Sequence, residues 1–174
     1  VFKTIAKNLK RRTPIVDERL IFHKKMPVPS WIELSIIDVC NRSCVFCPKS
    51  NPLVAPDTYQ QMENSLIEKL GQDLKKMGFK GSFTLCGYGE PMLHKNVNQI
   101  VKTLAKVSFV EVVTNGDTLT PKKIRDLYDS NLNKLLISLY DGPDQVKKFK
   151  EMQKTANVPE DFVILRDRWY SASE

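Results

Sequence analysis

Polar and apolar residues follow a helical period in four separate segments after residue 60. In residues 63–78, apolar side chains recur along one helical face, and Gly78 closes the pattern. Thr120 followed by Pro121 is typical of a helix start, because threonine caps the first turn and proline fits its first position. The pattern predicts helices at residues 63–78, 97–107, 120–131 and 142–155.

Short runs of β-branched and apolar residues lie between these segments. They predict strands at residues 31–40, 82–87, 109–116, 134–140 and 161–169. Strict alternation of strand and helix is typical of a parallel sheet built from right-handed βαβ units. At about 31 residues per unit of a (β/α)8 barrel, residues 31–174 hold about four and a half units. We therefore expect an α/β fold, a partial TIM-like barrel with outer helices, while the period also allows a doubly wound sheet.

The length of 174 residues fits one domain with its own core. No apolar run approaches the length of a membrane span, and no secretory signal pattern is visible, so we expect a cytoplasmic protein. In that reducing compartment, clustered cysteines more often hold a metal or perform redox chemistry than form disulfides. The chain starts with Val1 rather than methionine, and we interpret it as part of a longer protein.

The net charge of +7 is concentrated at the N-terminus, because residues 1–25 hold eight Lys or Arg and two Asp or Glu. Apolar residues at helical spacing in the same stretch predict an amphipathic helix. We therefore divide the chain into a basic arm, residues 1–30, and a core, residues 31–174. Such an arm is typically a solvated helix face, with contact to RNA, an anionic lipid surface or an acidic partner as alternatives.

Three of the four cysteines, Cys40, Cys44 and Cys47, stand in the loop after the first predicted strand, with the spacing C-x3-C-x2-C. A closed zinc site needs four ligands, and a redox C-x-x-C pair would leave the third thiol without a role. An iron–sulfur cluster uses thiolates grouped this tightly, and three of them would leave one iron open. Cys86 lies in an apolar strand and is interpreted as an ordinary buried cysteine.

A zinc site remains an alternative, because His23 or His94 could supply a fourth ligand, although their spacing does not require it. His94 is interpreted as a structural residue. The competing function for the whole chain is then a zinc-stabilised RNA-binding module whose basic arm contacts the nucleic acid.

Unusual loops follow the other predicted strands as well: GYGEPMLH, TNGD and SLYDGP come after the second, third and fourth. In parallel α/β folds the carboxyl ends of the strands share one edge, where binding sites form. These loops and the cysteine loop therefore predict a single site.

The segment CNRSCVFC, with Phe46 just before its last cysteine, resembles the signature of the radical S-adenosylmethionine (SAM) superfamily. GYGEP, residues 87–91, is similar to the second motif of that family, and TNG recurs in it after the third strand. The resemblance extends from residue 31 to about residue 168.

The resemblance implies an enzyme that binds a [4Fe–4S] cluster through Cys40, Cys44 and Cys47. The open iron would hold SAM, and a one-electron donor such as a flavodoxin- or ferredoxin-like protein would reduce the cluster. Reductive cleavage of SAM would yield a 5′-deoxyadenosyl radical that abstracts hydrogen from an unknown substrate, with a peptide as one candidate. The resemblance implies no catalytic residue beyond the cluster ligands.

The resemblance also implies a set of SAM contacts. Gly87 and Gly89 would let the backbone approach the methionine end, while Glu90 would support its ammonium group directly or through neighbours. Each polar position also has a plain structural alternative, such as a cap, a turn, a strand-end hydroxyl or a surface ion pair. The implied cofactor-binding residues are Phe46, Gly87, Gly89, Glu90, Asn115, Ser138 and Arg166.

Two features depart from the family pattern. The family core has six βα units, whereas four units and a strand are predicted here, and the glycine-rich SAM motif near strand five is not recognisable. The segment LRDRWY resembles a subgroup that continues into a cysteine-rich SPASM domain, but no cysteine follows Cys86 in this sequence.

Overall fold

The computed structural model describes residues 21–169 of the chain. Within them, five strands form one parallel sheet in the order β3-β4-β5-β6-β7, so neighbours along the chain are also neighbours in space. The strands are β3 (Trp31–Leu34), β4 (Ser82–Leu85), β5 (Phe109–Thr114), β6 (Lys134–Leu139) and β7 (Val163–Asp167). The helices between them are α2 (Asn64–Lys76), α3 (Val97–Ala105), α4 (Pro121–Asp129) and α5 (Asp144–Ala156).

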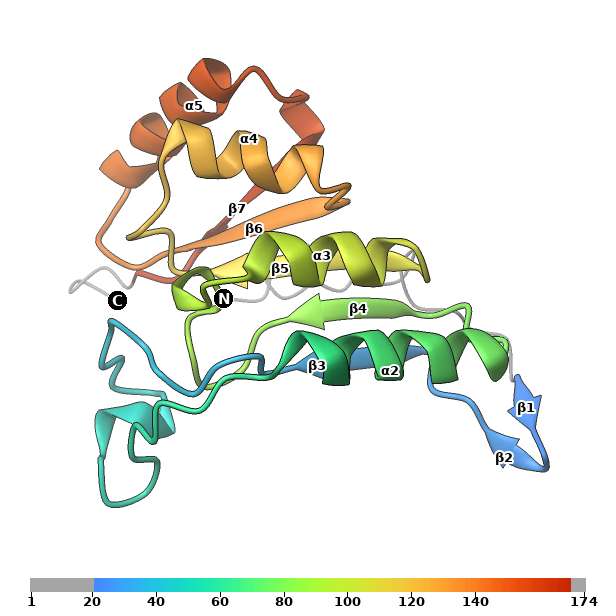
Figure 1. Ribbon diagram of the computed structural model, residues 1–174. Coiled ribbons are helices and arrows are strands. Elements are labelled where there is room, and N and C mark those ends of the chain that lie inside the picture. Colours follow the sequence, from blue (N-terminus) through green and yellow to red (C-terminus); the bar gives the residue numbers. More distant parts are fainter. Residues whose placement is uncertain (1–20, 170–174) are drawn as a thin grey trace.

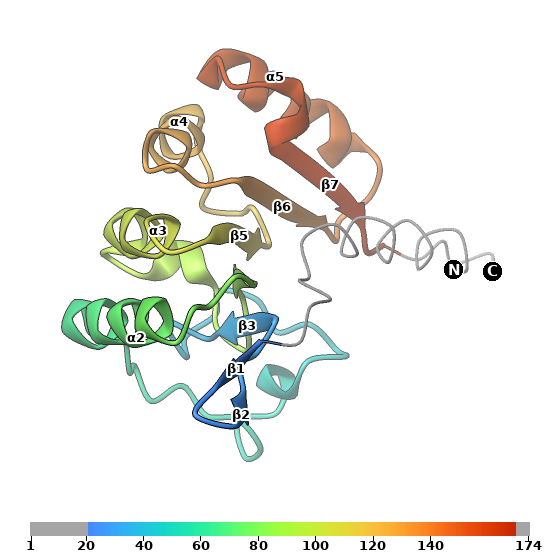
Figure 2. The same ribbon diagram turned by 90° about the vertical axis from the view of Figure 1, so that its right-hand side faces the viewer.

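The helices all cover the same face of the curved sheet (Figure 1), and Figure 2 shows them on its outer side. A doubly wound sheet would instead carry helices on both faces and reverse its strand order. The structure therefore confirms the predicted α/β fold, with parallel strands, outer helices and the arrangement of a barrel segment.

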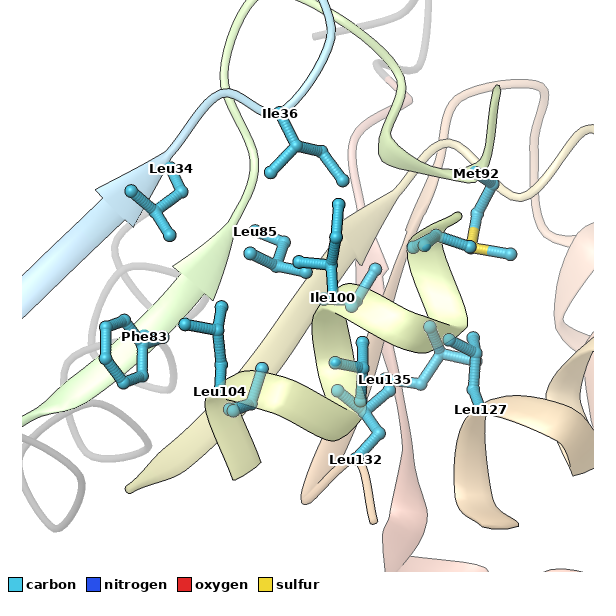
Figure 3. Close-up of a cluster of buried hydrophobic side chains, with 14 of the residues drawn as sticks. Leu34, Ile36, Phe83, Leu85, Met92, Ile100, Leu104, Leu127, Leu132 and Leu135 are labelled. Carbon is cyan, nitrogen blue, oxygen red and sulfur yellow. The ribbon is translucent and has the colours of Figure 1, made fainter. Parts of the chain in front are cut away.

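The core lies between the sheet and the helices (Figure 3). Phe83 and Leu85 project from β4 toward Ile100 and Leu104 of α3, and all four side chains are fully buried. Burying one such side chain contributes roughly 1.5–3 kcal/mol relative to leaving it in water. Because side chains alternate along a strand, Ser82 and Thr84 face the other side of the sheet.

The sequence correctly predicted where α4 begins and where α2 ends. Thr120 caps α4 by accepting a hydrogen bond from the Lys123 amide at 3.2 Å, with Pro121 at the first helical position. Gly78 follows α2 with a φ of 76°, a left-handed conformation that favours glycine.

The first strand is shorter than predicted and ends at Leu34 rather than residue 40. Residues 35–40 leave the sheet because they pair with a returning segment: the Met62 amide donates to Ile36 O at 2.9 Å, and Ile37 forms an isolated bridge with Gln61. This bend carries the cysteine loop away from the sheet.

Part of the predicted N-terminal arm can be placed. The short antiparallel strands β1 (Phe22–His23) and β2 (Met26–Pro27) form a hairpin within it. The predicted amphipathic helix and most of its basic residues lie outside the described residues. Between residues 21 and 169, no helix combines the length and apolar character needed to cross a bilayer.

Candidate functional site

A cavity of about 550 Å³ lies at the edge of the sheet where the parallel strands end. It receives residues from the loops after β3 and β4, from the ends of β5 and β6, and from β7. All ten predicted site residues line it: Cys40, Cys44, Phe46, Cys47, Gly87, Gly89, Glu90, Asn115, Ser138 and Arg166.

A second cavity of about 610 Å³ lies away from this edge, between α5 and β7. Its lining combines aliphatic side chains with surface lysines, and it contains none of the predicted site residues. A binding site typically combines an apolar pocket with convergent polar groups, and the cavity at the strand ends is the one with that character.

The three clustered cysteines are half-buried, and none of them forms a disulfide. Their loop has local order: the Cys47 amide donates to Cys44 O at 2.8 Å, and the short helix η2 (Pro48–Ser50) begins directly afterwards. In the described part of the chain, no three His, Cys, Asp or Glu side chains come together tightly enough to share one metal ion. Thiolates that each bind a different iron of a cluster need not meet at one point.

Burial raises the pKa of the Cys40 thiol, and the nearby charges of Glu90, Cys44 and Cys47 raise it further. The pKa of Cys44 is also raised, mainly by burial, although the positive charge of Arg42 acts in the opposite direction. The raised pKa values favour the protonated form of Cys40 and Cys44 in the metal-free chain. Because metals bind the thiolate form, metal binding would release those protons.

Glu90 is buried, with an exposed fraction of 3%, and its carboxylate joins two loops. Oε1 accepts hydrogen bonds from the Met92 amide at 2.9 Å and the Thr114 hydroxyl at 2.6 Å, while Oε2 accepts from the Asn115 amide at 2.8 Å. Burial raises the pKa of this carboxyl, although the three hydrogen bonds oppose the rise. Glu90 also caps the short helix η3 (Pro91–Leu93), so it has a structural role that does not depend on SAM.

The two glycines of this loop are required by the chain itself. A Cβ at Gly89 would lie 1.9 Å from Ile37 O, and one at Gly87, whose φ is 130°, would lie 2.6 Å from the Ser35 side chain. The loop after β4 therefore packs backbone to backbone on the bend after β3. This packing accounts for both glycines whether or not SAM approaches them.

The remaining predicted residues form contacts across neighbouring strands. Arg166 on β7 donates to Ser138 Oγ on β6 at 2.8 Å, in agreement with the register that pairs these residues. The side-chain nitrogen of Asn115, Nδ2, lies 2.8 Å from Asn41 Oδ1 and 4.0 Å from Cys40 Sγ. Phe46, which is 60% exposed, lies against Tyr140 with 5.9 Å between the ring centroids.

The structure contradicts the sequence interpretation of Cys86 and agrees with that of His94. The sequence indicates an ordinary buried cysteine at position 86, but Cys86 is half-buried just after the end of β4 and lines the cavity. Strand alternation explains this position, because Cys86 shares the face of Ser82 and Thr84. His94 is buried and contacts backbone at both ring nitrogens, Met62 O at 3.2 Å and the Asn96 amide at 3.1 Å, as a structural histidine would.

Sequence reasoning missed four residues that shape the site. Arg42, inside the cysteine motif, forms ion pairs with Asp117 and Asp141, and Tyr140 packs beside it. A signal was present, since both aspartates directly follow the ends of predicted strands in TNGD and SLYDGP.

Comparison with known proteins identifies the family of this chain. The Radical SAM superfamily profile matches residues 34–160. The chain is 29% identical over 116 residues to the S-adenosyl-L-methionine-dependent 2-deoxy-scyllo-inosamine dehydrogenase of Niallia circulans, covering 65% of this chain and 46% of that protein. It is 34% identical over 113 residues to the GTP 3′,8-cyclase of Picosynechococcus sp., covering 63% of this chain and 34% of that protein.

Among solved structures, BtrN in complex with AdoMet and 2-DOIA matches with a TM-score of 0.68 and 26% identity, covering 80% of this chain and 56% of that one. The chain belongs to the radical SAM superfamily, whose members are enzymes that use SAM and an iron–sulfur cluster. It spans less than half the length of each of these two curated relatives.

Proposed function

We propose that this chain binds a [4Fe–4S] cluster through Cys40, Cys44 and Cys47 and holds SAM in the adjoining cavity to begin radical chemistry. The observation that carries the proposal is the convergence of the three thiols and the seven other predicted residues on one cavity of about 550 Å³. This volume lies within the range of roughly 300–1,000 Å³ that is usual for cofactor and small-molecule sites.

When bound, the cluster would supply one electron for cleavage of the SAM sulfonium, which yields methionine and a 5′-deoxyadenosyl radical that abstracts hydrogen from the substrate. The side chains of the cavity would orient SAM. Arg166 and Ser138 form a polar pair suited to the methionine carboxylate. Phe46 and Tyr140 offer an aromatic surface for the adenine ring. Glu90 acts on the methionine ammonium through its neighbours, because its two oxygens already accept three hydrogen bonds.

A one-electron donor protein would supply the electron for radical formation, and the radical would then abstract a hydrogen atom from the substrate. The substrate class is left to experiment, because one relative is named for 2-deoxy-scyllo-inosamine and the other for GTP. Neither name favours a peptide, the candidate substrate that the sequence resemblance implies, so small polar molecules are the first substrates to test.

The experiment is anaerobic reconstitution with iron and sulfide, followed by iron and zinc analysis and an absorption spectrum. We expect about four irons per chain in the wild type and little iron in Cys40→Ala, Cys44→Ala or Cys47→Ala. Cys86→Ala is a matched control, because this cysteine lines the same cavity but should leave the iron content unchanged. Adding SAM and dithionite to the reconstituted protein should then release 5′-deoxyadenosine.

Two results would refute the proposal. One is stoichiometric zinc without iron in the reconstituted wild type, which would favour the zinc-stabilised binding module. The other is either a normal cluster in Cys44→Ala or loss of the cluster in Cys86→Ala, since each would show that the ligands are misassigned.

A further inference from the structure

Arg42 has an unusual set of partners for a residue inside a metal-binding motif. Its Nε and Nη2 lie 2.6 Å from the two oxygens of Asp117. Nη1 and Nη2 also lie 2.8 and 2.6 Å from the two oxygens of Asp141. One planar guanidinium therefore binds two carboxylates, each through both oxygens, which is a geometry that a lysine cannot reproduce.

The two carboxylates belong to different strands. Asp117 follows the end of β5 and Asp141 follows the end of β6, and they are 75 and 99 residues away from Arg42 in sequence. The guanidinium also lies 5.3 Å from the ring centroid of Tyr140, where its charge contacts the aromatic face. A single side chain thus ties the loop after β3 to the ends of two other strands.

A second contact fixes the residue next to Arg42. Asn41 donates to Asp117 Oδ2 at 3.0 Å, and its own side-chain oxygen accepts from Asn115 at 2.8 Å. The side chains of two of the three residues between Cys40 and Cys44 are therefore held by the loop after β5. We name this set, Asn41, Arg42, Asp117 and Asp141, the loop clamp.

Exposed ion pairs often contribute little to stability, because water screens them and ordering the side chains costs entropy. Here the side chain of Arg42 is only 20% exposed and that of Asp117 is 29% exposed, whereas that of Asp141 is 54% exposed. The four hydrogen bonds are short and share one rigid donor group, so less freedom is lost for each bond formed. Such a network can therefore order a loop that lies beyond the last hydrogen bonds of the sheet.

We infer that Arg42 is a positioning residue that holds the segment from Cys40 to Cys44 on the ends of β5 and β6 before any metal is bound. The three thiols then face one cavity in the metal-free chain, and cluster assembly need not order the loop. This preorganisation favours binding, because the ordering entropy is lost during folding instead. The link to cluster assembly rests on the proposed function, whereas the ordering of the loop does not.

The first test uses the metal-free protein and measures amide hydrogen exchange by mass spectrometry in peptides that cover residues 38–50. We expect protection in the wild type, including the Cys47 amide bonded to Cys44 O. In Arg42→Met, exchange of this segment should be roughly tenfold faster, which corresponds to about 1.4 kcal/mol. Arg42→Lys should lie between the two, since it keeps the charge but loses the fork.

The matched control is Arg125→Met. Arg125 also forms a bidentate pair, with Asp129, and lies over a tyrosine ring, Tyr128, at 5.1 Å, but it is on α4. We expect this variant to leave exchange of residues 38–50 unchanged. An equal effect of both variants, wild-type exchange in Arg42→Met, or a loop that is already unprotected in the wild type would each overturn the inference.

The second test measures the rate at which a chelator removes iron from the reconstituted protein. We expect roughly tenfold faster loss in Arg42→Met, a smaller increase in Asp141→Asn, and no further increase when the two are combined, because they belong to one network. Additive effects in the double variant would overturn the inference. If the wild type binds no cluster, the proposed function fails while the exchange experiment still tests the clamp; if the wild type binds one and loop exchange is unaffected, the clamp alone fails.

Discussion

The buried carboxylate of Glu90 allows a quantitative prediction, because every partner of its two oxygens is known. In Glu90→Ala the Met92 and Asn115 amides lose their acceptor. Leaving a buried donor unsatisfied costs about 1–3 kcal/mol, so the two together predict a loss of roughly 2–6 kcal/mol in the free energy of unfolding. In Glu90→Gln the amide oxygen can replace Oε1, but the NH2 group cannot accept from Asn115, which predicts a loss of about 1–3 kcal/mol.

Urea unfolding of the metal-free protein, followed by circular dichroism, measures these losses. Glu68→Gln on the exposed face of α2 is the control, and we expect it to change the free energy of unfolding by no more than about 0.5 kcal/mol. The order of stability should be wild type, then Glu90→Gln, then Glu90→Ala. If both Glu90 variants were as stable as the control, the carboxylate would not join the two loops.

The pH dependence gives the same prediction an independent readout. Because burial raises the pKa of Glu90 above its ordinary value, the folded chain holds this proton more tightly than the unfolded chain does. The stabilising contribution of the proton is therefore complete below the ordinary pKa and is lost as the pH rises through the raised pKa. Glu90→Gln should lack this decline, and an identical pH profile in the two proteins would contradict the burial argument.

Two further predictions concern the cavity. Gly89→Ala should lower the free energy of unfolding by about 1–3 kcal/mol or more, because its Cβ would lie 1.9 Å from the backbone oxygen of Ile37. Thermal unfolding can be compared with that of Gly71→Ala, whose Cβ would meet only a side-chain methyl group of Val107, at 3.3 Å. Arg166→Met should keep the iron content but weaken SAM binding about ten- to a hundredfold, as expected for one charge-assisted hydrogen bond. Calorimetry would measure this, and an unchanged dissociation constant would remove Arg166 from the SAM contacts.

The parts of the fold that depend on neighbouring segments were predictable from sequence. Each helix packs against strands next to it in the chain, so the apolar period of α3 and the apolar runs of β4 and β5 were sufficient. The bend after Leu34 was not predictable in this way. Residues 35–40 look like strand because they are apolar and β-branched, but their partners are residues 60–62 rather than β4.

The candidate site shows the same difference between features that nearby sequence determines and features that depend on distant contacts. Its residues could be found because each lies in the last residues of a strand or in the loop that follows one, and these strand ends meet at one edge of a parallel sheet. The partners of these residues could not be predicted. Arg42, for example, contacts Asp117 and Asp141, which lie 75 and 99 residues away in sequence, and no local pattern indicates such contacts. The position of Cys86 was within reach, since period-2 alternation from Ser82 and Thr84 places it on the face away from the helices.

The hydrogen bonds around the cavity have a common physical origin. Ladder hydrogen bonds stop where the strands stop, so the loops beyond them need other donors and acceptors to keep their spacing. Side chains take over this role here: Glu90 joins the loop after β4 to the end of β5, Asn41 joins the cysteine loop to Asn115, and Arg42 joins that loop to the ends of β5 and β6. Three charged or amide groups thus connect four strand ends. Two of these links involve charge-assisted hydrogen bonds, so side chains of the folded chain tie the loops that line the cavity firmly to one another.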